Sequence, residues 1–250
     1  MIEIKNISKT FNKGTADEIA ALKNLNLKIK EGDFITVVGF NGSGKSTLLN
    51  LISGSLIPDN GKIFFNDVDV TQLPDFKRSK YVSRIFQNPL AGTASELSII
   101  ENFRLAALRT QSKTLSIGNT KIFKESICEK LKTLNMGLEN KPTALMGSLS
   151  GGQRQALTLL MSVMDESKIL LLDEPTAALD PKSATIVMEL AEKIIREGNL
   201  TSLLVTHRMK DAINYGNRLI MMKEGQVEND YSKADKSVLN TDDLFRWFNI

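Results

Sequence analysis

Cysteine is nearly absent from this sequence, which holds a single one, Cys128, among its 250 residues. One cysteine excludes an internal disulfide and a CxxC metal knuckle, and it is typical of a reducing compartment such as the cytosol. We interpret Cys128 as a packing residue. Glycine and proline are few, at 16 and 6 residues, while apolar residues make up 42%, so disordered and fibrous classes are excluded.

Long hydrophobic runs and a strong charge excess are missing as well. A helix needs roughly 18 to 20 apolar residues to cross a bilayer, and no stretch comes close to that. Residues 1–6 mix charge with isoleucine instead of forming an apolar signal core. The net charge of +3 is too small for a surface that coats nucleic acid. We therefore expect a chain that is neither exported nor membrane-spanning, that reaches a membrane only through a partner, and that binds no nucleic acid.

The sequence does contain the pattern of a large α/β domain, and its length is sufficient for one. Ile2, Ile4 and the apolar positions within 25–29 alternate with polar residues, which predicts half-buried antiparallel strands near the N-terminus. Residues 34–38 form a compact apolar run that predicts a buried strand. Apolar residues at helical spacing within 48–52 predict a helix directly after it.

The rest of the chain is predicted to add helices and two more buried strands. Residues 95–145 look mainly helical, with Ile122, Ile127, Leu131 and Leu134 among charged residues. After Gly152, positions 157–164 have helical spacing, and the runs 169–172 and 203–205 predict buried parallel strands. A last helix is predicted to begin at Thr241 and Asp242, with Leu244, Phe245 and Phe248 packed on the core and Trp247 partly exposed.

The strongest chemical signal is a glycine-rich loop between a predicted strand and a predicted helix. Its residues satisfy the pattern G-x-x-x-x-G-K-[ST]: Gly39, Phe40, Asn41, Gly42, Ser43, Gly44, Lys45, Ser46 and Thr47. Glycines let backbone N–H groups surround phosphates, Lys45 supplies a positive charge, and the Ser46 hydroxyl can ligate Mg²⁺. The loop predicts an NTPase or a nucleotide kinase.

Two adjacent carboxylates, Asp173 and Glu174, follow the apolar run 169–172. Open α/β sheets bind their ligands at the carboxyl ends of strands. Asp173 there suits a Mg²⁺ ligand, and Glu174 suits a base that polarises water. Two solvated acids before a turn at Pro175 are the alternative interpretation of these two residues alone.

A third motif, Leu149-Ser150-Gly151-Gly152-Gln153, begins the helix predicted after Gly152. A serine cap and glycine N–H groups at a helix start form a second anion-binding position. An ordinary serine cap followed by a flexible glycine pair is the alternative.

These motifs, taken in their order, resemble those of the ATP-binding cassette (ABC) family over nearly the whole chain. By this resemblance Phe11 is the aromatic that stacks on adenine, Gly39 to Thr47 is Walker A and Gln87 is the glutamine loop. By the same resemblance, the signature is formed by Ser150, Gly151, Gly152 and Gln153. Walker B contains Asp173 and Glu174, the D-loop contains Asp180, and the switch histidine is His207.

The resemblance implies functions for these residues. Glu174 and His207 are expected to be catalytic; Ser46, Gln87 and Asp173 are expected to bind Mg²⁺; the loop, the signature, Phe11 and Asp180 are expected to contact ATP. For Phe11, a place in the core remains the alternative to stacking.

The resemblance also implies a fold. We expect a single domain over 1–250: a P-loop NTPase core of the RecA-like type with an N-terminal antiparallel β region, and an inserted helical subdomain. Residues 1–90 and 165–250 would form the core with its β region. Residues from about 91 to 164 would form the helical subdomain that carries the signature.

One Walker A motif and one signature imply a dimer. In this family the signature contacts the nucleotide of the opposite cassette, so two copies would pair head to tail around two ATP molecules. Because no membrane segment is predicted, a separate transmembrane permease is implied, with this chain in the cytoplasm as a peripheral protein on the inner face of the cell membrane. An extracytoplasmic substrate-binding protein is implied as well.

Three segments, 86–94, 150–161 and 215–222, resemble the bacterial uptake group for tryptophan and related aromatic substrates. Import of a small solute is the function we expect. One alternative is the ATPase of an exporter or of a mechanotransmission complex at the envelope. Another is a soluble cassette that acts on DNA or ribosomes, which the short stretch between Gln87 and Ser150 and the weak net charge disfavour.

Overall fold

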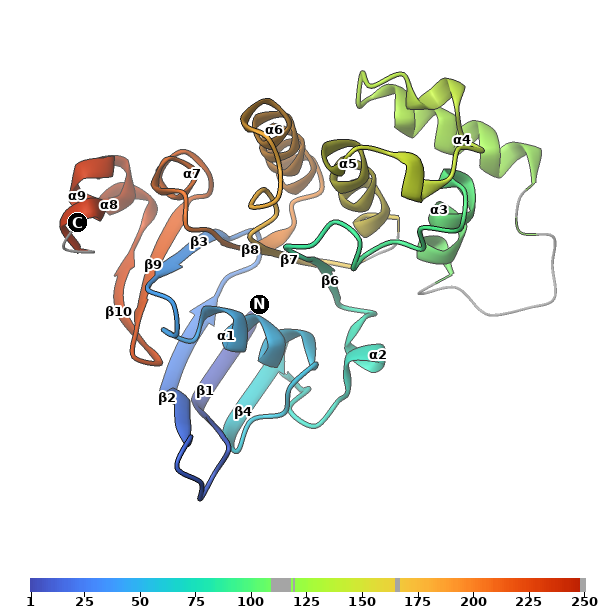
Figure 1. Ribbon diagram of the computed structural model, residues 1–250. Helices are drawn as coiled ribbons and strands as arrows, with labels where there is room; N and C mark the ends of the chain where they lie inside the picture. The colour runs from blue at the N-terminus through green and yellow to red at the C-terminus, as the bar shows by residue number, and fades with distance from the viewer. Residues whose placement is uncertain (109–117, 119, 165–166, 248–250) are drawn as a thin grey trace.

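The N-terminal strands form an antiparallel sheet, as the alternating pattern predicted. A computed structural model describes residues 1–108, 118, 120–164 and 167–247 (Figure 1). Its four-stranded sheet has the order β2-β1-β4-β5. The strands are β1 (Ile2–Phe11), β2 (Ile19–Ile29), β4 (Asn60–Phe65) and β5 (Val68–Asp69). Ile2 lies opposite Ile29 and Ile4 opposite Leu27, so the apolar positions share one buried face.

A second sheet of six strands has the order β10-β9-β3-β8-β7-β6. Its strands are β3 (Phe34–Gly39), β6 (Val82–Ile85), β7 (Ile169–Asp173), β8 (Thr201–Val205), β9 (Arg218–Lys223) and β10 (Gln226–Tyr231). β3 is parallel to β8 and β9, and β7 is parallel to β6 and β8, while β10 runs antiparallel to β9. The predicted buried strands are confirmed, and β3 and β8 are buried along their whole length.

Helix α1 (Lys45–Ser53) joins the two sheets into one core. Figure 1 shows it between the antiparallel sheet and the six-stranded sheet. Leu48 and Leu51 of α1 belong to one apolar cluster with Ile4 of the first sheet and Ile35 of the second. The helix that begins at the glycine-rich loop is therefore packed on both sides, and the loop itself has a rigid base.

The other face of the six-stranded sheet is covered by α5 (Gly151–Ser162) and α6 (Pro181–Glu197). Helices α3 (Ile99–Ala107) and α4 (Lys121–Lys132) extend this layer beyond β6, followed by the 3-10 turns Leu138–Asn140 and Met146–Ser148. The mainly helical character of 95–145 is confirmed for its described residues. The division into a core (1–90 and 165–250) and a helical subdomain (91–164) stays a prediction.

Ile122 departs from the predicted helical pattern, because it is 79% exposed while Ile127 and Leu131 are fully buried. Five positions along a helix turn by about 140° from Ile127, which places Ile122 on the solvent side. Cys128, on the same helix, is partly buried. Among the described residues no helix is both long and apolar enough to cross a membrane.

The C-terminal segment contains α7 (Met209–Asn214), α8 (Lys233–Ser237) and α9 (Thr241–Trp247). The remaining helix, the short α2 (Asp75–Arg78), precedes β6. In α9, Leu244 is fully buried as expected. The prediction that Phe245 packs on the core was wrong, since its side chain is 41% exposed. Consecutive residues face different sides of a helix. Phe248 lies outside the described residues. Trp247 is half-buried and stacks on Tyr231 with ring centroids 5.0 Å apart.

Lys236 of α8 anchors this segment to the sheet. Its side chain is buried, and Nζ donates to Thr36 Oγ1 at 3.1 Å and to the carbonyls of Tyr215 and Gly216. Burial lowers the pKa of Lys236 to about 8.

In the unfolded chain the pKa of Lys236 is about 10.5. Between pH 8 and 10.5 the native lysine is therefore neutral while the unfolded one is protonated, so unfolding takes up a proton. The free energy of unfolding consequently rises as pH rises through that window. We expect the free energy of unfolding of wild type relative to Lys236→Met to rise by about 2 to 3 kcal/mol from pH 7 to pH 10. Urea unfolding at the two pH values measures it. A difference that falls with pH would show that the native ammonium is not desolvated.

Candidate nucleotide-binding site

The predicted phosphate-binding loop connects the carboxyl end of β3 to the first turn of α1. Gly44 caps α1 with φ of 99°, a conformation that favours glycine, and a Cβ there would approach the carbonyl of Ala21 to 2.6 Å. A Cβ on Gly39 would lie 2.3 Å from the carbonyl of Met222. Both glycines are therefore required by the path of the loop. Ser43 is buried inside it, whereas Phe40, Asn41, Gly42 and Ser46 are exposed and Thr47 is partly buried.

Lys45 is buried at the N-terminal end of α1, where it is 6% exposed. Its Nζ donates to the carbonyls of Gly39 and Phe40 at 2.8 and 2.9 Å. Burial lowers the pKa of Lys45, and the carboxylates of Glu174 and Asp173 oppose that shift. The ammonium group and the N-terminal backbone of α1 together form a site that suits phosphate.

Glu174 is at the centre of the second part of the site, directly after β7. His207 Nε2 lies 2.7 Å from Glu174 Oε1, and Gln87 Nε2 donates to Glu174 Oε2 at 3.3 Å. Glu174 has φ of 48°, a strained conformation for a residue with a Cβ, and such residues gather at functional sites. Three residues that are far apart in the sequence thus meet at one carboxylate.

Asp173 has a partner that the sequence analysis did not identify. Arg84 Nη2 lies 2.7 Å from Asp173 Oδ2, and both side chains are largely buried. An arginine inside the apolar strand before Gln87 was the one hint in the sequence that this position needs a charged partner. That partner lies 89 positions away in the chain, so the sequence did not identify it. Ser46, Gln87 and Asp173 all offer oxygen atoms, the donor type that Mg²⁺ prefers, so the predicted set fits this ion chemically.

A cavity of about 260 Å³ brings many of the predicted residues together. It lies where the loop, the end of β1 and the carboxyl ends of β7 and β8 meet. Its lining includes Phe11, Asn41, Gly42, Gly44, Lys45, Ser46, Thr47, Glu174 and His207. Phe11 is partly buried at the edge of this cavity beside Ile19 and Ala21.

The predicted signature residues do not line that cavity. Ser150 caps α5 and exchanges two hydrogen bonds with Gln153, its Oγ accepting from the Gln153 amide at 3.3 Å. Gly152 packs against α6, where a Cβ would meet Ser183 at 2.7 Å, and Gly151 is exposed. Asp180 caps α6 by accepting from the amides of Lys182 and Ser183. The fold therefore divides the predicted ATP contacts into two separate groups.

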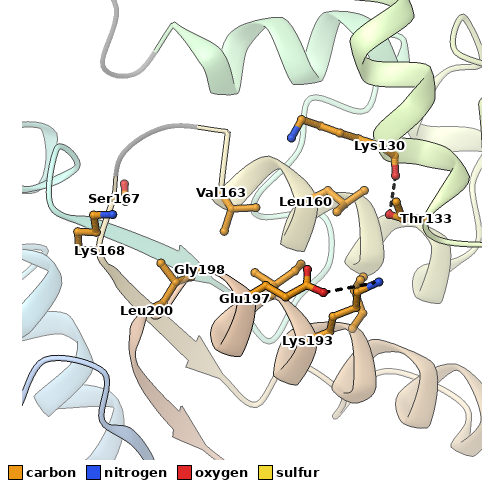
Figure 2. Close-up of a pocket in the computed structure, with 12 residues that line it drawn as sticks. Lys130, Thr133, Leu160, Val163, Ser167, Lys168, Lys193, Glu197, Gly198 and Leu200 are labelled. Carbon is orange, nitrogen blue, oxygen red and sulfur yellow. Dashed lines mark hydrogen bonds and ion pairs between the residues drawn. The ribbon is translucent and has the colours of Figure 1, made fainter.

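A cavity of about 410 Å³ lies elsewhere, at the amino ends of β7 and β8 (Figure 2). Apolar side chains such as Leu160 and Leu200 line it, and Lys193 and Glu197 form an ion pair at 4.0 Å beside it. It contains neither the glycine-rich loop nor the acidic pair. Although it is the larger of the two, it is not the nucleotide site, because parallel sheets bind ligands at their carboxyl ends.

A glycine-rich loop, a buried lysine and a carboxylate pair at the carboxyl edge of a parallel sheet define a P-loop NTPase. The profile of the ABC transporter family matches residues 22–177. The tyrosine transport ATP-binding protein of Clostridioides difficile is 40% identical over 249 residues, covering 99% of this chain and 98% of that protein. The phosphonates import ATP-binding protein PhnC of Lactococcus lactis subsp. cremoris is 32% identical over 250 residues, covering 98% and 99%.

A solved structure supports the same family. It is a dimeric structure of a post-hydrolysis state of an ATP-binding cassette bound to ADP and Pi, with a TM-score of 0.79 and 32% identity, covering 93% of this chain and 99% of that one. This chain belongs to the ABC transporter family. It is an ATPase subunit whose hydrolysis of ATP is coupled to transport, and the predicted fold class is confirmed.

Proposed function

We propose that this chain is the ATPase subunit of a bacterial importer for a small solute, with an aromatic amino acid as its substrate. Names of similar proteins support import: one concerns tyrosine transport, and others concern import of phosphonates and of methionine. The tyrosine transport protein, matched over nearly its whole length, agrees with the resemblance of three segments to the aromatic uptake group. A separate permease and an extracytoplasmic substrate-binding protein would complete the system, with this chain at the cytoplasmic face of the membrane.

Dimerisation is the second part of the proposal, and the division of the site supports it. Lys45 and Glu174 share one cavity, while Ser150 and Asp180 lie outside it. Each ATP would lie between the loop of one copy and the signature of the other, so two copies would form two sites. The dimeric relative bound to ADP and Pi has a cassette of the same fold.

Within each site, the residues would have distinct functions. Lys45 and the loop amides would hold the phosphates, and Glu174 would accept the proton of the attacking water, held in place by His207 at 2.7 Å. Ser46, Gln87 and Asp173 would bind Mg²⁺, which supplies positive charge to the phosphate oxygens. Glu174 is strained and touches both His207 and Gln87, so its carboxylate is held in one orientation.

Phe11 provides a test of base recognition. Stacking of a base on an aromatic ring contributes about 1 to 3 kcal/mol, so Phe11→Ala is expected to weaken ATP binding by about 5- to 150-fold. Isothermal titration with ATP and with inorganic triphosphate measures the effect, and only ATP is expected to lose affinity. An equal loss for both ligands would mean that Phe11 supports the loop as a core residue and does not contact the base.

A permease contact is proposed at a groove of about 510 Å³ between the segment after Gln87 and helices α3 and α5. Leu105 lines the groove and is 53% exposed, and Leu90, which is 48% exposed, precedes the groove residues Ala91 and Thr93. Both add apolar surface. A cytoplasmic helix of the permease would occupy the groove, close to the glutamine that touches Glu174.

Uptake of labelled tyrosine by cells tests the transport function. Cells that lack this chain are expected to lose uptake at micromolar tyrosine, and wild-type chain is expected to restore it, whereas Glu174→Gln is not. Undiminished uptake in the deletion strain, or a defect in efflux instead, would contradict the proposal for import of this substrate. A panel of labelled tryptophan, phenylalanine and methionine defines the substrate class.

A further inference from the structure

Arg84 of β6 makes three contacts that converge on the nucleotide site. Nη2 pairs with Asp173 at 2.7 Å, and Nη1 donates to Asn50 Oδ1 of α1 at 2.5 Å. The guanidinium also lies over the ring of Phe86, 4.9 Å from its centroid, directly before Gln87. One side chain thus connects the helix of the phosphate-binding loop, the end of β7 and the glutamine segment.

The same side chain lines the groove proposed for the permease. The groove is bordered by Arg84, Ala91, Thr93, Leu105 and Thr158 among others. Its wall after Gln87 is fastened to α3 by Asn102, whose side-chain amide exchanges two hydrogen bonds with the backbone of Ala94 at 2.8 and 3.0 Å. Arg84 therefore has the groove on one side and Asp173 on the other.

Stability alone is a poor explanation for an arginine here. A buried ion pair adds little net stability compared with apolar residues that fill the same space. Among the described residues, Nε of Arg84 is buried without a hydrogen-bond partner, and such a group destabilises the fold. A planar guanidinium can donate to two acceptors from separate nitrogens while its face lies on a ring, whereas lysine has a single nitrogen without this planar spread. The arrangement suits a connection between sites better than a structural pair.

We propose that Arg84 is a positioning residue that couples the groove to the nucleotide site. A change in the position of the groove wall changes the orientation of Asp173, and a change at Asp173 moves the groove wall. A shift of the segment from Phe86 to Ala94 would displace the ring under the guanidinium. Because the guanidinium also holds Asp173 Oδ2 and Asn50 Oδ1, that displacement reorients the carboxylate and α1 together. This inference rests on the proposed functions of the groove and of the nucleotide site.

A fluorescent reporter in the groove tests the connection without any permease. Leu105, which is 53% exposed on the groove wall, is replaced by cysteine in a Cys128→Ser background and labelled with bimane. Bimane emission is recorded without nucleotide and then with Mg²⁺ and a saturating non-hydrolysable ATP analogue. The affinity for that analogue is measured separately by isothermal titration, once with Mg²⁺ and once with EDTA. The variants are Arg84→Met, Arg84→Lys and the control Arg196→Met. Arg196 is exposed, and its ion pair among the described residues is with Glu192 of its own helix.

We expect the analogue to change the emission of the wild type and of Arg196→Met to the same extent. In Arg84→Met the change is expected to fall about fivefold or more at saturation, while affinity in EDTA stays within about twofold, because the loop and Lys45 are intact. Arg84→Lys is expected to keep the charge beside Asp173 and still lose the emission change, because it cannot hold Asn50 and Phe86 as well.

Three results would overturn the inference. The first is an emission response in Arg84→Met as large as that of the wild type, and the second is no response in a wild type that binds the analogue. The third is an equal loss of affinity for the analogue with and without Mg²⁺ in both Arg84 variants, which would mean that Arg84 merely supports the fold. A wild-type protein that binds no nucleotide at all would instead contradict the proposed function.

Discussion

Glu174→Gln is expected to bind ATP as tightly as wild type and to hydrolyse it at least about 100-fold more slowly. The amide has the size and shape of the carboxylate, so the contacts with His207 and Gln87 at 2.7 and 3.3 Å have room to persist. An amide cannot accept the proton of the attacking water. Since hydrolysis is what would separate the two copies, the variant is also expected to accumulate as a dimer with Mg-ATP.

Gel filtration with Mg-ATP, together with steady-state phosphate release, measures both effects. Glu192→Gln is the matched control, because Glu192 lies on α6 and its ion pair in the described part of the chain is with Arg196 of the same helix at 2.7 Å. It is expected to hydrolyse ATP like the wild type and to form no stable dimer. A Glu174→Gln protein that binds ATP but elutes only as a monomer counts against the composite site.

Lys45→Met is expected to have the largest effect on binding itself, with a loss of ATP affinity of about 10- to 100-fold. A hydrogen bond to a charged group contributes about 1.5 to 3 kcal/mol, and the buried ammonium serves more than one acceptor. Methionine fills the same space, so α1 and its packing on both sheets are expected to survive.

Isothermal titration with ATP and with ADP measures this loss, and circular dichroism checks the fold. Lys193→Met, which changes the cavity at the opposite ends of β7 and β8, is the control and is expected to bind like the wild type. If Lys193→Met weakens ATP binding as much as Lys45→Met does, the site has been assigned to the wrong end of the sheet.

Much of the fold was predictable because its signals are local. Alternation in β1 and β2, the apolar run of β3 and the loop pattern that ends in Lys45 each depend on neighbouring residues, and the structure confirms them. For the same reason, the cavity contains the residues that the loop and strand-end patterns identified, Lys45 and Glu174 among them.

Contacts between distant segments were not predictable. Arg84 meets Asp173 across 89 positions, and the buried Arg78 binds the carbonyls at the end of α1, including that of Ile52 at 3.1 Å. Each arginine also has a contact nearby in the sequence, Arg84 with Phe86 and Arg78 with the carbonyl of Leu73, but these local contacts do not indicate the distant partners. The side on which Phe245 faces depends on how α9 packs against α7 and β9, a property of tertiary packing. A short helix pattern alone does not determine it.

The composite site is tested most directly by mixing two defective proteins. Lys45→Ala disables the loop and keeps the signature, whereas Ser150→Phe blocks the signature and keeps the loop. Each is expected to be inactive alone. In an equal mixture half of the dimers pair the two variants and restore one of two sites, so ATPase activity is expected to reach about one quarter of the wild-type value. A mixture as inactive as its components, or a Ser150→Phe protein with full activity by itself, would contradict the account.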